Sequence, residues 1–267
     1  MLNVSIVIYK QAFSETEGLI RSLLSSKLVH KLFIIDNSPT PLREYKIDGV
    51  HYTFTGKNIG YGAGHNIALR KSIKEAIPYH LVVNPDISLN SDIFKEMLDY
   101  LNTNQDVGLL MPKVLNTDGS LQYLCKLLPT PMDLLLRRFL PTTCFRNKQN
   151  RFEMRNSGYH QIMEVPYLSG CFMLLRTEIL EKTGLFDERF FLYPEDIDLT
   201  RRIYTHYKTI FYPHVHVVHK HEKGSYKSLK MMLIHVYNMM KYFNKWGWIY
   251  DKERKTINQK LIKKWDL

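Results

Sequence analysis

Apolar runs rich in valine and isoleucine alternate with helical patterns through the first half of the chain. The apolar runs predict strands at residues 4–9, 32–35, 50–54, 79–83 and 107–111. Helices are expected between them, the first beginning at the capping box Ser14-Glu15-Thr16-Glu17 and others within 59–74 and 91–101. Strands that alternate with helices form sheets with crossover helices, so the predicted fold class is α/β.

The pattern loosens after residue 126. Residues 127–164 contain three prolines and several arginines and lysines, which predicts a variable insertion that is partly mobile. Strands at 165–168, 171–176, 209–212 and 215–218 and a helix at 195–204 complete a predicted domain over residues 1–221. One helical face carries the apolar residues Leu229, Met232, Leu233, Val236, Met240 and Phe243, so residues 222–267 predict an amphipathic helical C-terminal extension.

The bulk composition is that of an ordinary globular protein. The chain has 267 residues, of which 45% are hydrophobic and 24% are charged. Its three cysteines form no C-x-x-C pair, which favours a reducing compartment over a disulfide scaffold. The first residues lack the pattern of a secretory signal, and about 18 uninterrupted apolar residues occur nowhere, so we expect a cytoplasmic protein.

The positive charge is concentrated at the C-terminal end. The net charge is +11, and residues 220–267 carry 12 Lys and Arg against 4 Asp and Glu, or +8. All three tryptophans lie in the same segment, among further aromatic residues. Basic residues mixed with aromatics suit an anionic membrane surface. A plainly solvated charge is the alternative, and no nucleic acid is expected because no helix-turn-helix, finger or RNP-type motif accompanies the charge.

Two acidic signals carry the candidate chemistry. Asn84-Pro85-Asp86 directly follows a buried strand, where one carboxylate could hold a divalent cation against a diphosphate or cap the next helix. Residues 186–199 bring acids and aromatics to the start of a predicted helix. Asp196 and Asp198 point about 200° apart on that helix, so only one of them should face a ligand as a general base.

Two further patterns lie beside these acids. Strand alternation places His214 and His216 on one face and His219 and His221 on the other, so all four cannot bind one ion. Residues 56–66 form a glycine-rich loop that leads into a helix. Its backbone N–H groups could bind an anion, or its glycines could let the helix pack closely on the sheet. The loop lacks the P-loop pattern.

Taken in chain order, six segments resemble family-2 inverting glycosyltransferases of the GT-A fold, in the bacterial rhamnosyltransferase-like or galactofuranosyltransferase-like branch. The segments are residues 4–9 (VSIVIY), 34–38 (IIDNS), 58–66 (NIGYGAGHN), 84–86 (NPD), 168–176 (LSGCFMLLR) and 186–199 (FDERFFLYPEDIDL). The resemblance covers residues 4–221. It implies the GT-A fold, with a mixed, mostly parallel central sheet flanked by helices.

The resemblance also implies roles for individual residues. Asp196 would be the catalytic base, with Glu195 beside it, and Asp86 would ligate Mn²⁺ or Mg²⁺, with His219 as a further ligand. Asp36 would read the nucleobase. The other expected nucleotide-binding residues are Tyr9, Asn58, Gly60 and Asn84, and the expected substrate-binding residues are Asn66, Ser169 and Gly170.

The function so implied is inverting sugar transfer from a nucleotide-diphosphate sugar to a saccharide or polyprenyl-diphosphate-linked acceptor, in surface polysaccharide synthesis. We expect the C-terminal extension to bind the inner face of the cell membrane. Removing residues from Tyr242 onward would then weaken liposome binding and spare nucleotide binding. Two departures matter: Asn84 replaces the first acid of D-x-D, and Pro194 replaces an aromatic residue before the acidic pair.

Two other functions compete with transfer. A sugar-nucleotide nucleotidyltransferase would share the nucleotide-binding sheet, but the glycine-rich, basic N-terminal signature of that class is missing after Tyr9. A catalytically inactive subunit that binds a sugar nucleotide or a partner would be compatible with Asn84. Nucleoside-diphosphate release by the purified protein discriminates both from a transferase.

Overall fold

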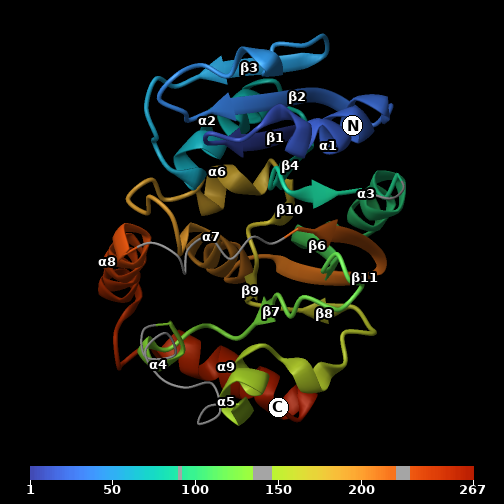
Figure 1. Cartoon of the computed structure of the whole chain (residues 1–267). Coiled ribbons are helices and arrows are strands. Elements are labelled where there is room, and N and C mark those ends of the chain that lie inside the picture. Colours follow the sequence, from blue (N-terminus) through green and yellow to red (C-terminus); the bar gives the residue numbers. More distant parts are fainter. Residues whose placement is uncertain (90–91, 135–145, 221–228) are drawn as a thin grey trace.

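A nine-stranded mixed sheet organises the chain (Figure 1). The computed structural model describes residues 1–89, 92–134, 146–220 and 229–267. Eight strands follow the order β3-β2-β1-β4-β10-β6-β11-β5, and β8 pairs with β11 off this path. The strands are β1 (Leu2–Ile8), β2 (Val29–Asp36), β3 (Val50–Phe54), β4 (Tyr79–Val83), β5 (Ile87–Ser88), β6 (Val107–Leu115), β8 (Met163–Glu164), β10 (Phe172–Arg176) and β11 (Lys208–His219).

The first four strands run parallel, with β1 between β2 and β4. Strand β10 is antiparallel to both of its neighbours, β4 and β6, and β6 runs parallel to β11. A separate two-stranded antiparallel sheet joins β7 (Cys125–Lys126) to β9 (Tyr167–Leu168). Because the parallel strands share one direction, β2 and β4 end at the same edge of the sheet, which is the usual ligand edge of such folds.

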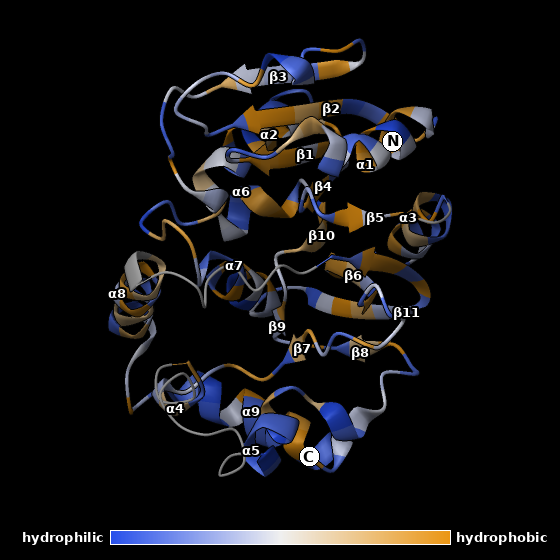
Figure 2. Cartoon of the chain, viewed as in Figure 1, coloured by the Kyte–Doolittle hydropathy of each residue, from blue (hydrophilic) through white to orange (hydrophobic). Residues whose placement is uncertain are grey.

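Helices cover both faces of this sheet. One face packs on α1 (Phe13–Ser25) and α3 (Phe94–Thr103). The other packs on α2 (Tyr61–Lys74), α6 (Ile179–Thr183) and α7 (Glu195–Tyr204). The central strands β4 and β10 are mostly apolar and fully buried, which agrees with cover on both sides (Figure 2).

The C-terminal helices belong to the same core. Helices α8 (Leu229–Trp246) and α9 (Lys252–Trp265) contribute Tyr242, Phe243 and Leu261, each at most 2% exposed, to the cluster that also holds α7. None of the helices in the described ranges is long and apolar enough to cross a bilayer. The described part of the predicted extension, residues 229–267, therefore packs on the preceding domain.

Most predicted elements are present, with three differences. Helix α1 begins at Phe13, and its N-cap residue Ala12 makes no side-chain bond, so the predicted capping box is wrong. The two strands predicted at 209–212 and 215–218 form one strand, β11, whose register shifts between Tyr212 and His216. Residues 127–164 contain α4 (Pro131–Leu134), α5 (Arg146–Phe152) and the 3₁₀ turn η4 (Arg155–Ser157), and part of this segment lies outside the described residues.

Candidate active site

The candidate site lies where β4 ends. The Asn84 backbone N–H donates to the carbonyl of Cys171 on the neighbouring loop, 2.9 Å away, which fixes the chain just before Asp86. A cavity of about 530 Å³ opens beside these residues. It is lined by Val7, Lys10, Gln11, Glu15, Tyr61, Asn84, Pro85, Asp86, Ser88 and Lys220. This volume lies in the range of small-molecule sites, roughly 300–1,000 Å³.

Asp86 and His219 form the part of the site that could hold a cation. Oδ1 of Asp86 lies 3.2 Å from Nε2 of His219, whose side chain is 6% exposed. Oδ1 is buried and accepts no hydrogen bond from the described residues. In the described ranges no three His, Cys, Asp or Glu side chains gather as a metal cluster. One carboxylate and one imidazole suit a divalent cation that completes its shell with substrate phosphates.

Asp196 lies in the first turn of α7, directly beside the loop that follows β9. Its Oδ2 accepts the backbone N–H of Gly170 at 2.9 Å, and its Oδ1 accepts that of Ile197 at 2.8 Å. A side chain at position 170 would come within 3.1 Å of the Asp196 Cβ, so glycine allows this approach. Burial raises the pKa of Asp196, although the Gly170 bond and the charge of Lys126 oppose the rise.

Glu195 is buried beside Asp196. It is 4% exposed, and its Oε2 has no hydrogen-bond partner among the described residues. Burial and the charge of Asp196 raise the pKa of Glu195 well above its usual value. Burial thus disfavours the charged form of Glu195, while Asp196 keeps two backbone hydrogen bonds that stabilise its carboxylate.

Tyr61 connects the two acidic parts of the site. Its hydroxyl donates to the carbonyl of Gly170, 2.7 Å away, so one residue, Gly170, bonds both Tyr61 and Asp196. Burial raises the pKa of Tyr61 well above its usual value, and the charges of Asp196 and Asp86 add to the rise. Asp86 and Asp196, 110 positions apart in the sequence, thus lie around the same tyrosine.

The glycine-rich loop packs against the acidic segment. Gly60 has φ +95°, and a Cβ there would lie 2.4 Å from the carbonyl oxygen of Phe191. The Gly60 N–H donates to the exposed Asn58 side chain at 3.0 Å. At Gly62 a Cβ would lie 2.8 Å from the Cβ of Phe186. These contacts support the close-packing interpretation of the loop.

Asn66 holds the acidic segment to α2 and does not face the cleft. It is 1% exposed, donates to the Phe186 carbonyl and to Glu188, both at 2.9 Å, and accepts the Phe186 N–H at 3.1 Å. Three of the four hydrogen bonds that its amide can form are thus made inside the protein, and the predicted substrate contact is corrected to a positioning role. Ser169 is half-buried, and its hydroxyl lies 3.5 Å from the backbone N–H of Cys171.

Asp36 is buried at the end of β2, with 0% exposure. Its carboxylate accepts hydrogen bonds from the backbone of Ser38 and Leu42 and from the hydroxyl of Tyr52. Burial alone would raise the pKa of Asp36, but these bonds hold it below its usual value. The carboxylate shapes the loop after β2 and offers no exposed atom to a base, whereas Tyr9, 48% exposed, does face solvent.

The predicted alternation of the histidines is confirmed for the described residues. His214 and His216 are exposed, His219 is buried against Asp86, and His221 lies outside the described residues.

The C-terminal helices brace α7 through Asp198, which is 0% exposed and points away from the cleft. Its Oδ1 lies 2.6 Å from Nζ of Lys245 and accepts the indole N–H of Trp246 at 2.8 Å. Its Oδ2 accepts from Arg202 at 2.9 Å. Asp196 and Asp198 thus have different partners, and the assignment of Asp196 to the ligand side stays a prediction.

A second buried pair ties α7 to α9. Arg201 donates to both oxygens of Asp251, at 2.7 and 2.8 Å, and both side chains are at most 3% exposed. The Arg201 guanidinium also lies 4.0 Å from the ring of Trp246. Two ion-pair sites therefore fix the helix that carries Asp196 to the last 30 residues of the chain.

Sequence reasoning missed Tyr61, Lys126 and the brace on Asp198. The position of Tyr61 had a signal, because it is the aromatic residue directly after Gly60 in the glycine-rich loop. Lys126 and Lys245 had none, because a lysine in a basic segment gives no local sign of a buried acid that it faces across the fold.

Comparisons with known proteins show the family and the fold of the chain. A family model described as "Glycosyltransferase like family 2" matches residues 44–238. The low-salt glycan biosynthesis hexosyltransferase Agl10 of Haloferax volcanii is 28% identical over 205 residues, 75% of this chain and 61% of that protein. An N-acetylglucosaminyl-diphospho-decaprenol L-rhamnosyltransferase of Mycobacterium tuberculosis is 29% identical over 182 residues, 62% of this chain and 57% of that protein.

The chain thus spans about three fifths of the length of these two relatives. Solved structures with the same fold include GalNAc-T7 with UDP, GalNAc and Mn²⁺, with a TM-score of 0.63 and 12% identity over 99% of this chain and 55% of that one. Staphylococcus aureus TarS 1–349 with UDP has a TM-score of 0.57 and 14% identity over 98% of this chain and 70% of that one. The fold is GT-A.

Proposed function

Because the chain belongs to the family described as Glycosyltransferase like family 2, we propose that it transfers a sugar, with inversion, from a nucleotide-diphosphate donor to an acceptor hydroxyl. The observation that carries the proposal is the position of Tyr61, which lines one cavity with Asp86 and donates a hydrogen bond to Gly170, the residue whose N–H bonds Asp196. Asp86 could hold a cation against the diphosphate of the donor, and Asp196 could take the proton of the attacking alcohol.

Asp196 is the base in this proposal. As the acceptor oxygen forms its bond to the anomeric carbon, the bond from that carbon to the diphosphate breaks, and Asp196 takes the hydroxyl proton. One displacement inverts the anomeric centre. The raised pKa of Asp196 makes it a stronger base than a solvated aspartate, and the Gly170 and Ile197 N–H groups hold both of its oxygens in place.

Asp86 and His219 would hold a divalent cation, Mn²⁺ or Mg²⁺. When bound, such an ion neutralises the charge that develops on the departing diphosphate. Among the described residues that line the cavity, Lys10 and Lys220 add positive charge on the same side. Asn84, which replaces an acid, leaves this side less negative and offers an amide to ribose or phosphate.

The acceptor in this proposal is a lipid-linked saccharide, and the enzyme works at the inner face of the cell membrane. The name of the mycobacterial relative describes a decaprenol-linked diphosphate sugar. The surface that would meet the membrane is the exposed turn between α8 and α9, where Ile249 is 81% and Tyr250 95% exposed. Leu233 and Tyr237, 59% and 60% exposed, continue it along α8.

The structure changes how this membrane proposal is tested. Tyr242 and Phe243 are fully buried, and Asp251 is the partner of Arg201, so removal of residues 242–267 would disrupt the core and could not spare nucleotide binding. Ile249→Asp combined with Tyr250→Asp is the suitable change. It should weaken sedimentation with anionic liposomes and leave nucleotide affinity unchanged, with exposed Lys260→Asp as the charge control.

The transfer itself is tested with a panel of nucleotide-diphosphate sugars in the presence of Mn²⁺ or Mg²⁺. The expected result is nucleoside-diphosphate release that rises when a saccharide acceptor is added, with a product of inverted anomeric configuration by NMR. Release of inorganic diphosphate from a nucleoside triphosphate and a sugar phosphate would identify a nucleotidyltransferase. Donor binding with no turnover on the whole panel would identify a binding subunit.

A further inference from the structure

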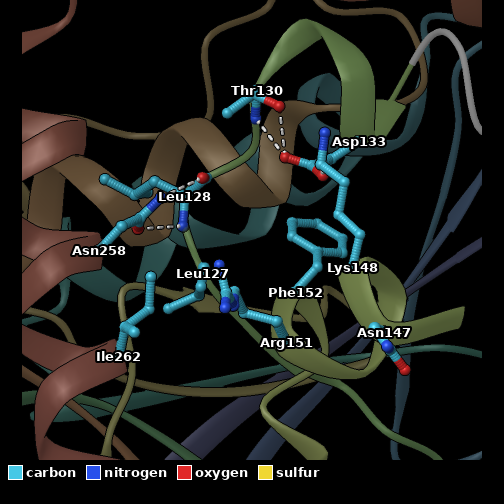
Figure 3. Close-up of a pocket in the computed structure, with 10 residues that line it drawn as sticks. All are labelled: Leu127, Leu128, Thr130, Asp133, Asn147, Lys148, Arg151, Phe152, Asn258 and Ile262. Carbon is cyan, nitrogen blue, oxygen red and sulfur yellow. Dashed lines mark hydrogen bonds and ion pairs between the residues drawn. The ribbon is translucent and has the colours of Figure 1, made fainter. Parts of the chain in front are cut away.

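A second cavity, of about 450 Å³, lies between residues 127–133 and 147–152 on one side and helix α9 on the other (Figure 3). Its floor consists of the buried side chains of Leu127, Leu128 and Phe152, each at most 5% exposed. Ile262 on α9 lines it from the other side. The size suits a small ligand, and an apolar lining of this kind favours a ligand segment that needs no hydrogen bonds.

Hydrogen bonds across the chain hold the walls in place. The Asn258 side chain on α9 accepts the Leu128 N–H at 2.9 Å and donates to the Leu128 carbonyl at 2.8 Å. The Leu127 N–H donates to the carbonyl of Phe152 at 3.0 Å. Because these bonds fix the floor to both α5 and α9, the cavity is formed before any ligand enters it.

Two positively charged side chains, those of Arg151 and Lys148, lie at the edge of the apolar floor. The guanidinium of Arg151 extends beside Leu127, and the ammonium of Lys148 points toward Asp133 (Figure 3). Lys148 lies 3.8 Å from Oδ1 of Asp133, whose Oδ2 accepts hydrogen bonds from Thr130. Arg151 has no ion pair within the described part of the chain. An exposed arginine beside an apolar floor suits a phosphate group attached to an apolar chain.

The cavity is also close to the acceptor side of the candidate active site. Lys126 immediately precedes Leu127, and its positive charge lowers the pKa of Asp196. Lys126 pairs with Tyr167 across the small sheet, three residues before Gly170, which bonds Asp196. Consecutive residues of an extended chain advance about 3.3 Å, so Leu127 at the cavity lies only a few residues from the strand pair that leads to Gly170 and the proposed base Asp196.

We propose that this cavity binds the isoprenoid segment next to the phosphate of the lipid-linked acceptor, with Arg151 at that phosphate. The inference rests on the proposed function, because it names the acceptor of the same reaction. The acceptor sugar would then lie toward Lys126 and Asp196, while the rest of the lipid leaves the cavity toward solvent or the membrane.

The test measures binding of farnesyl diphosphate to the full chain by calorimetry, without any sugar donor. Farnesyl diphosphate should bind about tenfold or more tightly than inorganic diphosphate and more tightly than farnesol. Arg151→Glu should weaken its binding about tenfold or more, and Ile262→Trp, which fills the cavity from a half-exposed position, should abolish it. Arg146→Glu, exposed on the same helix and outside the lining, is the matched control and should change affinity less than about twofold.

Affinity for farnesyl diphosphate no higher than for inorganic diphosphate, or an equal loss in Arg151→Glu and Arg146→Glu, would overturn the proposal. Equally tight binding of a short-chain phosphatidic acid would assign the cavity to a phospholipid instead of the acceptor. If Ile262→Trp does not fold, Arg151→Glu decides alone. Nucleoside-diphosphate release with a soluble acceptor reports the proposed transfer separately, so a protein that turns over donor without binding farnesyl diphosphate loses only the lipid site.

Discussion

Lys245 on α8 places its ammonium nitrogen 2.6 Å from Oδ1 of the buried Asp198, two residues beyond Asp196. The same ammonium lies 2.9 Å from Oδ2 of Asp187. Lys245, which belongs to the basic C-terminal region, therefore neutralises two acids of residues 186–199. Part of the positive charge of that region is thus paired inside the protein and does not face solvent. This ion pair therefore links the C-terminal helices to α7, and we expect it to stabilise the fold of the domain that carries Asp196.

Replacing Lys245 should destabilise the protein and reduce turnover together. Lys245→Met leaves Asp198 with Arg202 and Trp246, so we expect a loss of about 1–3 kcal/mol in the free energy of unfolding. At about 2–4 °C per kcal/mol for a chain of this size, thermal unfolding would show the change. The value of kcat should fall while donor KM stays constant. Exposed Lys260→Met is the control, and an equal effect in both variants would contradict the brace.

Alanine at position 60 should be far more damaging than alanine at position 119. Both glycines have positive φ, +95° and +80°, so the backbone strain of substitution is similar. Only at Gly60 would the new Cβ lie 2.4 Å from a carbonyl oxygen, that of Phe191, whereas nothing lies within 4 Å at Gly119. The difference between the two variants, about 1–3 kcal/mol by chemical denaturation, isolates the clash. Equal losses would show that the loop does not need this close contact.

Glu195 and Glu188 should change stability with pH in opposite directions. The folded-state pKa of Glu195 is raised, so its contribution is fully present below the unfolded pKa of about 4.3 and is lost as the pH rises through the folded pKa. Glu195→Gln should therefore gain melting temperature relative to the native protein as the pH increases from 4 to 8.

Glu188 is the opposite-sign control. Hydrogen bonding by Asn66 and the charge of Arg70 lower the pKa of Glu188, so its contribution is present above the unfolded pKa and lost as the pH falls through the folded pKa. Glu188→Gln should lose melting temperature at neutral pH and converge with the native protein in acid. If the melting temperature of either variant differed from that of the native protein by a constant amount at every pH from 4 to 8, the pKa assignment for that residue would be wrong.

Turnover should need a higher concentration of divalent metal when the carboxylate of Asp86 is removed. Asp86→Asn keeps the side-chain shape but removes the charge beside His219, so the Mn²⁺ or Mg²⁺ concentration for half-maximal nucleoside-diphosphate release should rise about tenfold or more. The control is Asp118→Asn, whose carboxylate caps an exposed turn through Ser120. An unchanged metal titration would remove Asp86 from the metal site.

The sequence predicted the sheet well because its strands are continuous apolar runs. The strands at 50–54 and 79–83 and the helix at 195–204 have the predicted ends. The two strands around Pro213 could not be joined in advance, because proline breaks the local pattern while pairing with β6 on both sides of a register shift restores the strand. Such long-range pairing is not a property of the local sequence.

The sequence indicated the acidic residues of the candidate site but not the residues of the C-terminal helices that hold α7 in place. Asp86 lies after β4 and Asp196 lies in the first turn of α7, as the sequence predicted, and His219 is the last residue of β11. The roles of these three residues stay predictions. The periodicity of residues 229–243 predicted one apolar face, which is only partly confirmed, because Phe243 is buried in the cluster that holds α7 but Leu233 and Met240 are 59% and 44% exposed. The buried face of α8 carries Met239, Tyr242 and Phe243 instead. Asp198 meets Lys245 across 47 residues, a contact that only the folded chain reveals.

The central claim is that Asp196 removes the proton of the acceptor while other residues bind the donor. The most direct measurement compares Asp196→Asn with the native protein for nucleoside-diphosphate release and for donor affinity in the same metal buffer. Loss of one ionised base should reduce kcat by about 10²–10⁴-fold. Donor affinity should remain within about twofold, since the donor contacts lie at Asp86. A kcat within a few-fold of the native value would contradict the account.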